Sequence, residues 1–353
     1  MTRPRIAFAV PGKITTLTGG TIYDRRVIEK LPALGCDVQH IELPNSFPAP
    51  PPDDMDHALA QLSDVPPDVP LIVDGLAFGA LDPRRVSGIQ SPLVPLVHHP
   101  LAEESGLTEG RRKHLFETER ANLSHAHHVL VPSPHTAELL TRKYDVQRKN
   151  ITIARPGTDR PRLAAAPIDP PLILAVGIQL PRKGHDVLIR ALSQIKALEW
   201  QAVIAGAPLD PAFSDELRAL RSDTGLDERL KLAGRIERDE LERLYAKASI
   251  FALATRYEGY GIVFDEALSH GLPIVSCAAG AVPDTVPHEA GLLVPPDAPD
   301  AFADALRTML TDLSFRQGCA AAARIAGDAL PGWDDTAKAI ADALEEILVI
   351  QVS

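Results

Sequence analysis

Short runs of apolar residues alternate with amphipathic stretches along the whole chain. The apolar runs are bounded by turn residues and rich in aliphatic side chains, which is typical of strands buried on both faces of a parallel sheet. In the N-terminal half we expect strands at Arg5–Val10, Leu71–Asp74, Leu93–Val97 and His128–Val131. In the C-terminal half we expect strands at Leu172–Val176, Ala202–Ala205, Leu230–Leu232, Ile250–Leu253 and Ile274–Ser276.

The stretches between these runs have the apolar spacing of helices that cover one face of a sheet. The clearest are Tyr23–Leu34, Thr136–Tyr144, Asp186–Leu198, Pro211–Thr224 and Asp239–Lys247. Regular alternation of strand and helix predicts an α/β fold with doubly wound parallel sheets. Ligands of such sheets bind beyond the carboxyl ends of the strands, so the loops at those ends should carry the chemistry.

A length of 353 residues favours two domains. The proline-rich stretch Arg155–Pro171 has little periodicity and is interpreted as the linker. We therefore predict an N-terminal Rossmann-like domain over residues 1–163 and a second over residues 164–330. Residues 331–353 are expected to form a C-terminal helix that crosses back to the first domain. Pro44–Pro52 is interpreted as a surface loop.

The net charge of −11 is unevenly distributed. Residues 1–165 hold 19 Lys and Arg against 19 Asp and Glu, whereas residues 166–353 hold 17 against 28. This acidic second half argues against a nucleic-acid partner, because binding phosphate backbones requires a basic face. Two basic clusters, Arg84-Arg85 and Arg111-Arg112-Lys113, are interpreted as solvated surface. The alternative is a docking surface for an anionic acceptor or for lipid at the inner face of a membrane.

The three cysteines lie far apart and form no CxxC pair, which excludes a disulfide scaffold and a zinc finger. No apolar run reaches the length of a membrane span, and the N-terminus lacks the pattern of a signal peptide. These features predict a cytoplasmic protein.

The segment TRYEGYGIVFDEALSHG, residues 255–271, contains the most informative group of residues. A helix should begin near Ile262 and end at Gly271, which places the N–H groups of residues 261–263 at a helix N-terminus suited to a pyrophosphate. Glu258 precedes this helix, and Glu266 lies about one turn into it. A carboxylate at Glu266 could accept two hydrogen bonds from a vicinal diol such as a ribose.

This segment resembles the E-x7-E signature of the family-4 retaining glycosyltransferases, and other stretches follow in the order expected of that family. They are Pro11–Thr21, Ala175–Asp186, Val203–Gly206, Leu232–Leu244, Ala279–Val286, Gly291–Asp297 and the segment around Trp333. Pro156–Asp159 also resembles a segment that this family has at the junction of its domains. The resemblance implies a GT-B fold, with two Rossmann-like doubly wound domains facing a central cleft. It also implies transfer of a hexosyl unit, with retention of configuration, from a UDP- or GDP-sugar to a sugar, lipid or small-molecule acceptor. Neither a metal nor another cofactor is implied.

By the same resemblance, Glu266 would hold the donor ribose and Glu258 a hydroxyl of the transferred sugar. The backbone at Gly261, Ile262 and Val263 would face the diphosphate or the sugar. Arg235, in a loop beside the nucleobase, would stack on the base or face solvent.

The family usually places an arginine and a lysine on the diphosphate, in the pattern G-R-L-x-x-x-K-G. Lys183 and Gly184 match this pattern, but Ile178 stands where the arginine is expected. Arg182 could replace the missing cation or face solvent, and the sequence leaves both interpretations open. Lys183 is the safer assignment, because the charge of a leaving group requires a fixed cation.

In the first domain, Gly20 would bring backbone amides to the donor, and a histidine after Leu93–Val97 would touch the donor sugar. The context H-x-L-A favours His99 over His98. With Glu258 and Lys183, His99 completes the expected catalytic set.

Three other classes of protein remain as alternatives. A glycoside hydrolase would use Glu258 and Glu266 as its paired carboxylates. A nucleotide-sugar epimerase shares the fold, and a non-catalytic nucleotide-sugar binder would explain the loss of a phosphate ligand at Ile178. HExxH does not occur, and no metal-binding motif is assigned.

Overall fold

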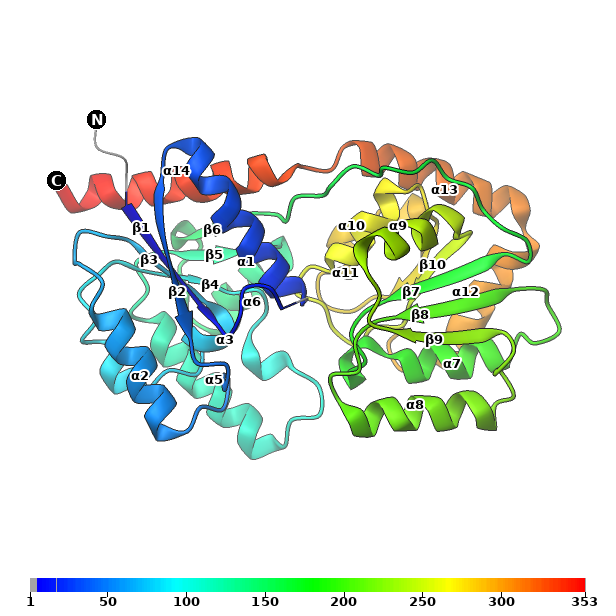
Figure 1. Ribbon diagram of the computed structural model, residues 1–353, viewed down its shortest axis with the longest axis horizontal. Coiled ribbons are helices and arrows are strands. Elements are labelled where there is room, and N and C mark those ends of the chain that lie inside the picture. The colour runs from blue at the N-terminus through cyan, green and yellow to red at the C-terminus, as the bar shows by residue number, and fades with distance from the viewer. Residues whose placement is uncertain (1–4, 17, 353) are drawn as a thin grey trace. The chain divides into compact units, whose positions relative to one another are not determined.

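The computed structural model describes residues 5–16 and 18–352, and the chain divides into two units (Figure 1). Unit 1 comprises Met1–Gly157 with Pro331–Ser353, and unit 2 comprises Thr158–Leu330. Leu17, within the motif Pro11–Thr21, lies outside the described residues. Each unit contains one six-stranded parallel sheet flanked by helices, so the predicted α/β fold is confirmed.

The sheet of unit 1 has the order β2-β1-β3-β4-β5-β6. Its strands are β1 (Arg5–Pro11), β2 (Asp37–Leu43), β3 (Leu71–Asp74), β4 (Leu93–Leu96), β5 (Val129–Val131) and β6 (Ile151–Ile153). The direction in which successive strands are added reverses between β1 and β3. This reversal is the topological switch point, where doubly wound sheets bind ligands.

The helices of unit 1 connect these strands. They are α1 (Gly19–Lys30), α2 (Pro52–Ser63), α3 (Gly75–Phe78), α4 (Pro83–Val86), α5 (Glu109–Leu123), α6 (Pro134–Lys143) and α14 (Trp333–Val352), with short 3₁₀ turns η1 (Leu31–Leu34), η2 (Leu101–Glu103) and η3 (Arg148–Asn150). The predicted start of the first helix, at Tyr23, is wrong. The helix begins at Gly19, because the Thr18 side chain caps it by accepting from the Thr21 N–H at 3.2 Å.

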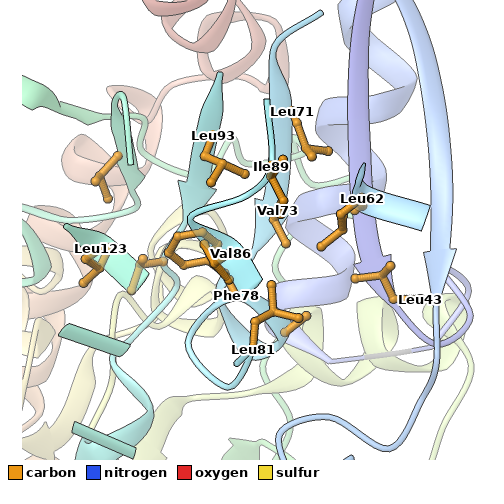
Figure 2. Packing of buried hydrophobic residues seen from close by; sticks show 14 of the residues in the cluster. Leu43, Leu62, Leu71, Val73, Phe78, Leu81, Val86, Ile89, Leu93 and Leu123 are labelled. Atoms are coloured by element: carbon orange, nitrogen blue, oxygen red, sulfur yellow. The ribbon is translucent and has the colours of Figure 1, made fainter. Parts of the chain in front are cut away.

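A continuous apolar core fills one face of this sheet. Figure 2 shows Val73 of β3 and Leu93 of β4 among the side chains of this cluster, together with Phe78, Leu81 and Leu123. All five are at most 4% exposed. Burial of this extent fixes the strands, and with them the loops at the carboxyl edge that carry polar residues.

The C-terminal helix α14 packs within unit 1. The Trp333 ring lies edge-on to Tyr23 at 5.9 Å, and the Thr336 hydroxyl donates to the Arg155 carbonyl at 2.7 Å. Lys30 Nζ lies 2.9 Å from Asp334 Oδ1. Within the described part of the chain, no helix combines the length and apolar character needed to cross a bilayer.

The sheet of unit 2 has the order β12-β11-β10-β7-β8-β9. Its strands are β7 (Leu172–Val176), β8 (Gln201–Ala205), β9 (Leu230–Gly234), β10 (Ile250–Leu253), β11 (Ile274–Cys277) and β12 (Gly291–Val294). The switch point lies between β7 and β10, which pair directly. The loops that follow these two strands therefore meet at one place on the carboxyl edge.

Helices cover both faces of the second sheet. They are α7 (His185–Ser193), α8 (Pro211–Asp223), α9 (Arg238–Lys247), α10 (Ile262–Ser269), α11 (Val282–Thr285), α12 (Pro299–Thr311) and α13 (Leu313–Asp328), with 3₁₀ turns η4 (Pro181–Lys183) and η5 (His288–Ala290). Alternate residues of β7 enter different cores: Ile173 packs in the cluster that includes α7 and α12, and Leu174 in the cluster that includes α10. Burial on both faces explains the continuous apolar run of this strand.

Two arginines of the basic cluster Arg111-Arg112-Lys113 make hydrogen bonds within unit 1. Arg111 donates to the Pro48 carbonyl at 2.7 Å, and Arg112 donates to the carbonyls of Ala102 and Glu104. These guanidinium groups hold loops together, which differs from the expectation of a purely solvated surface.

Candidate functional site

The turn after β7 in unit 2 carries two cations and lies against the end of β10. Pro181–Lys183 forms a 3₁₀ turn that ends at Gly184, whose φ of +62° is left-handed. A Cβ at Gly184 would lie 1.8 Å from the Ala254 carbonyl oxygen, so only glycine allows this approach. The side chains of Arg182 and Lys183 are thereby placed beside the loop that follows β10.

Glu258, in that loop, accepts from both cations. Lys183 Nζ lies 2.6 Å from Glu258 Oε1, and Arg182 Nη1 lies 3.4 Å from Oε2. The Thr255 hydroxyl donates to Oε1 at 2.9 Å. Burial alone would raise the pKa of Glu258, but the charges of Lys183 and Arg182 outweigh it and hold this pKa below its usual value. The carboxylate is therefore ionised, and the three side chains carry a net charge of about +1 at neutral pH.

Helix α10 begins directly after this loop. Gly261 precedes the helix with a φ of +91°, and its Cβ would lie 2.6 Å from the Phe264 ring, so glycine is required here. Ile262 and Val263 are the first two residues of the helix, so the helix itself provides no carbonyl acceptor for their N–H groups. Gly261, Ile262 and Val263 therefore form the helix N-terminus predicted from the sequence, a place where an anion is favoured.

The carboxylate of Glu266 is held by a side chain of the neighbouring helix α9. The Tyr245 hydroxyl of α9 donates to Glu266 Oε2 at 2.8 Å, and the Tyr245 ring stacks on His270 at 4.8 Å. Burial raises the pKa of Glu266, and the hydrogen bond from Tyr245 opposes this rise. This bond fixes one carboxylate oxygen, and the other oxygen could accept a further hydrogen bond.

Two other predicted positions lie at the carboxyl edge of the same sheet. Ile178 follows β7 and is partly buried, and its carbonyl accepts from the Leu180 N–H at 2.9 Å. Arg235 follows Gly234 at the end of β9, which is an edge strand two positions from β7, and it is exposed. The structure thus brings Lys183, Arg182 and Glu258 together but places Arg235 at the far end of the sheet edge.

In unit 1, His98 follows β4 and lies at the switch point with two carboxylates. His98 Nε2 is 2.9 Å from Asp24 Oδ1 and 3.4 Å from Asp74 Oδ2. A Cβ at Gly20 would lie 3.1 Å from the His98 ring, so the imidazole packs against the Gly20 backbone. His99 Nε2 instead lies 3.5 Å from Glu104 Oε2. The histidine that contacts Gly20 is therefore His98.

The three titratable groups of this cluster perturb one another. Burial alone would lower the pKa of His98, but Asp24 and Asp74 raise it to about 10. Burial raises the pKa of Asp24 to about 8, against the influence of His98. Burial would raise the pKa of Asp74, but the hydrogen bond and charge of His98, together with hydrogen bonds from Asp24 and the Leu76 N–H, lower it. At neutral pH the cluster consequently holds an imidazolium beside an ionised Asp74.

The same three residues form the one group of His, Cys, Asp and Glu, within the described residues, whose atoms could surround a metal ion. Their ligand atoms lie within 4.8 Å of one another. The separations of 2.9 and 3.4 Å are close to those of N–H···O hydrogen bonds, so the Nε2–H group of His98 can be shared between the two aspartates. The geometry fits a hydrogen-bonded charge cluster better than a cation site.

Sequence reasoning missed the two aspartates. Asp24 lies in the helix after β1, and Asp74 is the last residue of β3, so both lie near the carboxyl ends of strands at the switch point. The signal available was positional: an acidic residue that ends a buried apolar run, as in LIVD, is a candidate site residue.

Two doubly wound parallel units in one chain are the GT-B fold. The chain superposes on sucrose-phosphate synthase from Thermosynechococcus elongatus with a TM-score of 0.82 and 22% identity, covering 98% of this chain and 100% of that one. It also superposes on the Anabaena protein HepE in complex with UDP-glucose, with a TM-score of 0.76 and 16% identity over 97% of this chain and 100% of that one. Residues 170–312, within unit 2, match the family model described as Glycosyl transferases group 1.

Curated relatives are similar over part of their length. A D-inositol 3-phosphate glycosyltransferase of Xylanimonas cellulosilytica is 33% identical over 225 residues, which cover 58% of this chain and 54% of the relative. A GDP-mannose-dependent alpha-(1-6)-phosphatidylinositol monomannoside mannosyltransferase of Mycobacterium tuberculosis is 33% identical over 185 residues, or 49% and 47%. The chain spans about half the length of the curated relatives that it matches.

Proposed function

We propose that this protein is a retaining, metal-independent glycosyltransferase that uses a nucleotide diphosphate sugar, either a UDP- or a GDP-sugar, as donor. The observation that carries the proposal is the convergence of Lys183 and Arg182 on Glu258 at the switch point of unit 2. This cluster lies beside the N-terminus of α10. It also falls within the segment that matches the glycosyltransferase model.

The donor diphosphate would bind Lys183 and Arg182, with the N–H groups of Ile262 and Val263 completing the anion site. An ammonium has three N–H donors, so Lys183 can serve Glu258 and a phosphate oxygen at once. Glu266 would accept from the ribose. As the bond from the anomeric carbon to the phosphate oxygen breaks, negative charge grows on the diphosphate, and fixed cations stabilise that charge most in the transition state.

Glu258 would accept from a hydroxyl of the transferred sugar and so fix the position of the anomeric carbon. Retention is explained by attack of the acceptor hydroxyl on the face that the diphosphate leaves. The new bond joins the acceptor oxygen to the anomeric carbon, and the acceptor proton passes to the departing phosphate oxygen. This chain then supplies positioning and charge, and no covalent sugar intermediate forms.

The acceptor that we propose is a sugar, a lipid or a small polyol. The relatives described above are named for D-inositol 3-phosphate and for a phosphatidylinositol monomannoside, and these names support a hydroxyl-rich acceptor. A lipid acceptor would require peripheral contact of unit 1 with a membrane from the cytoplasmic side. Cosedimentation with anionic vesicles tests that contact, and no binding at low salt would exclude it.

The main test is a thermal-shift screen of UDP- and GDP-sugars, followed by transfer assays with the donor that binds, with and without EDTA. We expect one donor to raise Tm, transfer to need an acceptor, the product to retain the anomeric configuration, and EDTA to have no effect. Each alternative has its own result. Donor binding without turnover indicates a binder, conversion of the donor without acceptor indicates an epimerase, and release of sugar from a glycan without nucleotide indicates a hydrolase.

A further inference from the structure

Arg256, at the carboxyl end of β10, ties together the two loops that form the candidate donor site. Its Nη1 and Nη2 donate to the two oxygens of Asp186 at 2.9 and 2.8 Å, and its Nε donates to Asp297 Oδ1 at 2.7 Å. Nη1 also donates to the carbonyl of Pro181, the first residue of the cationic turn. One guanidinium thus binds the helix that follows the turn, the turn itself and the loop after β12.

The backbone around Arg256 reinforces this connection. The Arg256 N–H donates to the Arg182 carbonyl at 2.8 Å, and the Thr255 hydroxyl lies 3.1 Å from the same oxygen. The carbonyls of the turn are therefore held by residues that immediately precede Glu258. Arg182 and Lys183 project from a backbone whose position depends on these bonds.

We propose that Arg256 is a positioning residue that fixes the two diphosphate-binding cations. The inference rests on the proposed function, because the position of Lys183 matters only if an anion binds there. Arg256 is about a quarter exposed, and its bidentate contact with Asp186 has the fork geometry that only a guanidinium provides. It acts on the ligand through Lys183 and Arg182, by holding the turn that carries them.

A matched control is available in the same unit. The guanidinium of Arg229 also makes four hydrogen bonds, to the carbonyls of Lys196, Leu198 and Trp200, and it stacks on the Trp200 ring. Arg229 directly precedes β9, so it lies at the amino ends of the strands, whereas the candidate site lies at their carboxyl ends. Arg229→Gln should therefore lower stability by an amount similar to Arg256→Gln without affecting nucleotide binding.

The test compares Arg256→Gln, Arg256→Lys and Arg229→Gln in the full chain. Calorimetry measures the affinity for UDP and GDP and for the corresponding nucleosides, and hydrogen exchange measures protection of residues 177–184 without ligand. We expect Arg256→Gln to lose at least tenfold in diphosphate affinity, to keep its nucleoside affinity and to exchange faster over this segment. Arg256→Lys should recover little, because it restores the charge and not the bidentate bond.

Three results would overturn the inference. In the first, Arg256→Gln binds the diphosphates as tightly as the parent. In the second, Arg229→Gln loses as much diphosphate affinity as Arg256→Gln. In the third, Arg256→Lys regains the full diphosphate affinity, which would indicate a role for charge alone. Failure of the parent itself to bind UDP and GDP is a different outcome, because it removes the proposed function and this inference with it.

Discussion

Replacing Arg182 with alanine tests whether this arginine supplies the cation that Ile178 cannot. Arg182 Nη1 donates to the Tyr257 carbonyl at 3.0 Å and lies 3.4 Å from Glu258 Oε2, which is longer than the 2.7–2.9 Å typical of strong ion pairs. Its loss should therefore lower the free energy of unfolding by only about 1 kcal/mol. A charge-assisted hydrogen bond to a diphosphate is worth about 1.5–3 kcal/mol, so UDP or GDP affinity should fall about 10- to 100-fold.

Lys183→Ala provides the comparison, because its ion pair is shorter and equally buried. Its Nζ lies 2.6 Å from Glu258 Oε1, and the side chain is 12% exposed. Removing one partner of a buried pair costs about 3–5 kcal/mol when the other charge is left alone. Arg182 and Thr255 still contact Glu258, so we expect a loss of about 2–3 kcal/mol in stability together with the loss of affinity. The two variants should thus differ in stability more than in binding.

The assay is calorimetric titration with UDP and GDP, with the nucleosides as controls and chemical denaturation as the measure of stability. If Arg182 already neutralises the phosphates, then adding a cation through Ile178→Arg should change diphosphate affinity by less than about threefold. Unchanged affinity in Arg182→Ala, combined with tighter binding in Ile178→Arg, would refute the reasoning. It would mean that the site operates with one cation fewer than the family pattern provides.

Three further predictions concern the remaining site residues. Glu266→Ala should weaken nucleoside binding by about 1–3 kcal/mol, because a buried acceptor for the ribose diol is lost, and Tyr245→Phe should weaken binding less. Calorimetry on the folded variants measures these affinities, and parental affinity in both variants would contradict the prediction. Because the pKa of Glu258 is lowered in the folded protein, its ionised form contributes stability that is present above the ordinary pKa of 4.5 and is lost as the pH falls through the folded value. The free energy of unfolding should therefore differ less between the parent and Glu258→Gln below about pH 4.5 than above it. Chemical denaturation at several pH values measures this difference, and a difference that does not change with pH would argue against the ion pairs. His98→Gln should reduce kcat more than His99→Gln does, because His98 is the ring held against Gly20. The opposite order would support His99, the histidine expected from the sequence, as the catalytic one.

The central strands and the edge strand β9 were predictable from the sequence, whereas the other three edge strands were not. β2, β6 and β12 each lie at the border of a sheet. An edge strand buries less of its surface, so selection for apolar residues is weaker there and the run loses its contrast with the flanking loops. In β2 only Ile41 and Leu43 are buried. The hydrophobic pattern therefore reveals the interior of a sheet more clearly than its edges.

The candidate site was predictable as separate segments but not as a set of contacts. Glu258 and Lys183 were assigned from local motifs, yet the ion pair joins residues 75 positions apart. It exists because β7 and β10 are neighbours in the sheet, and strand order is not a local property of the sequence. The same reason explains why Asp24 and Asp74 were missed beside His98. Their partnership arises where β1, β3 and β4 end together.

The three side chains that would meet the diphosphate have a net charge opposite to that of the half of the chain that contains them. Residues 166–353 account for the full net charge of −11, yet Lys183, Arg182 and Glu258 together carry about +1 where a diphosphate would bind. Exposed charges are screened beyond about 8 Å at physiological ionic strength, whereas partly buried groups such as these three are screened much less. The acidic surface therefore opposes long anionic polymers, which must contact many surface positions, but it has little influence on a small ligand held by two fixed cations and a helix N-terminus. An acidic domain and an anionic donor are compatible for this reason.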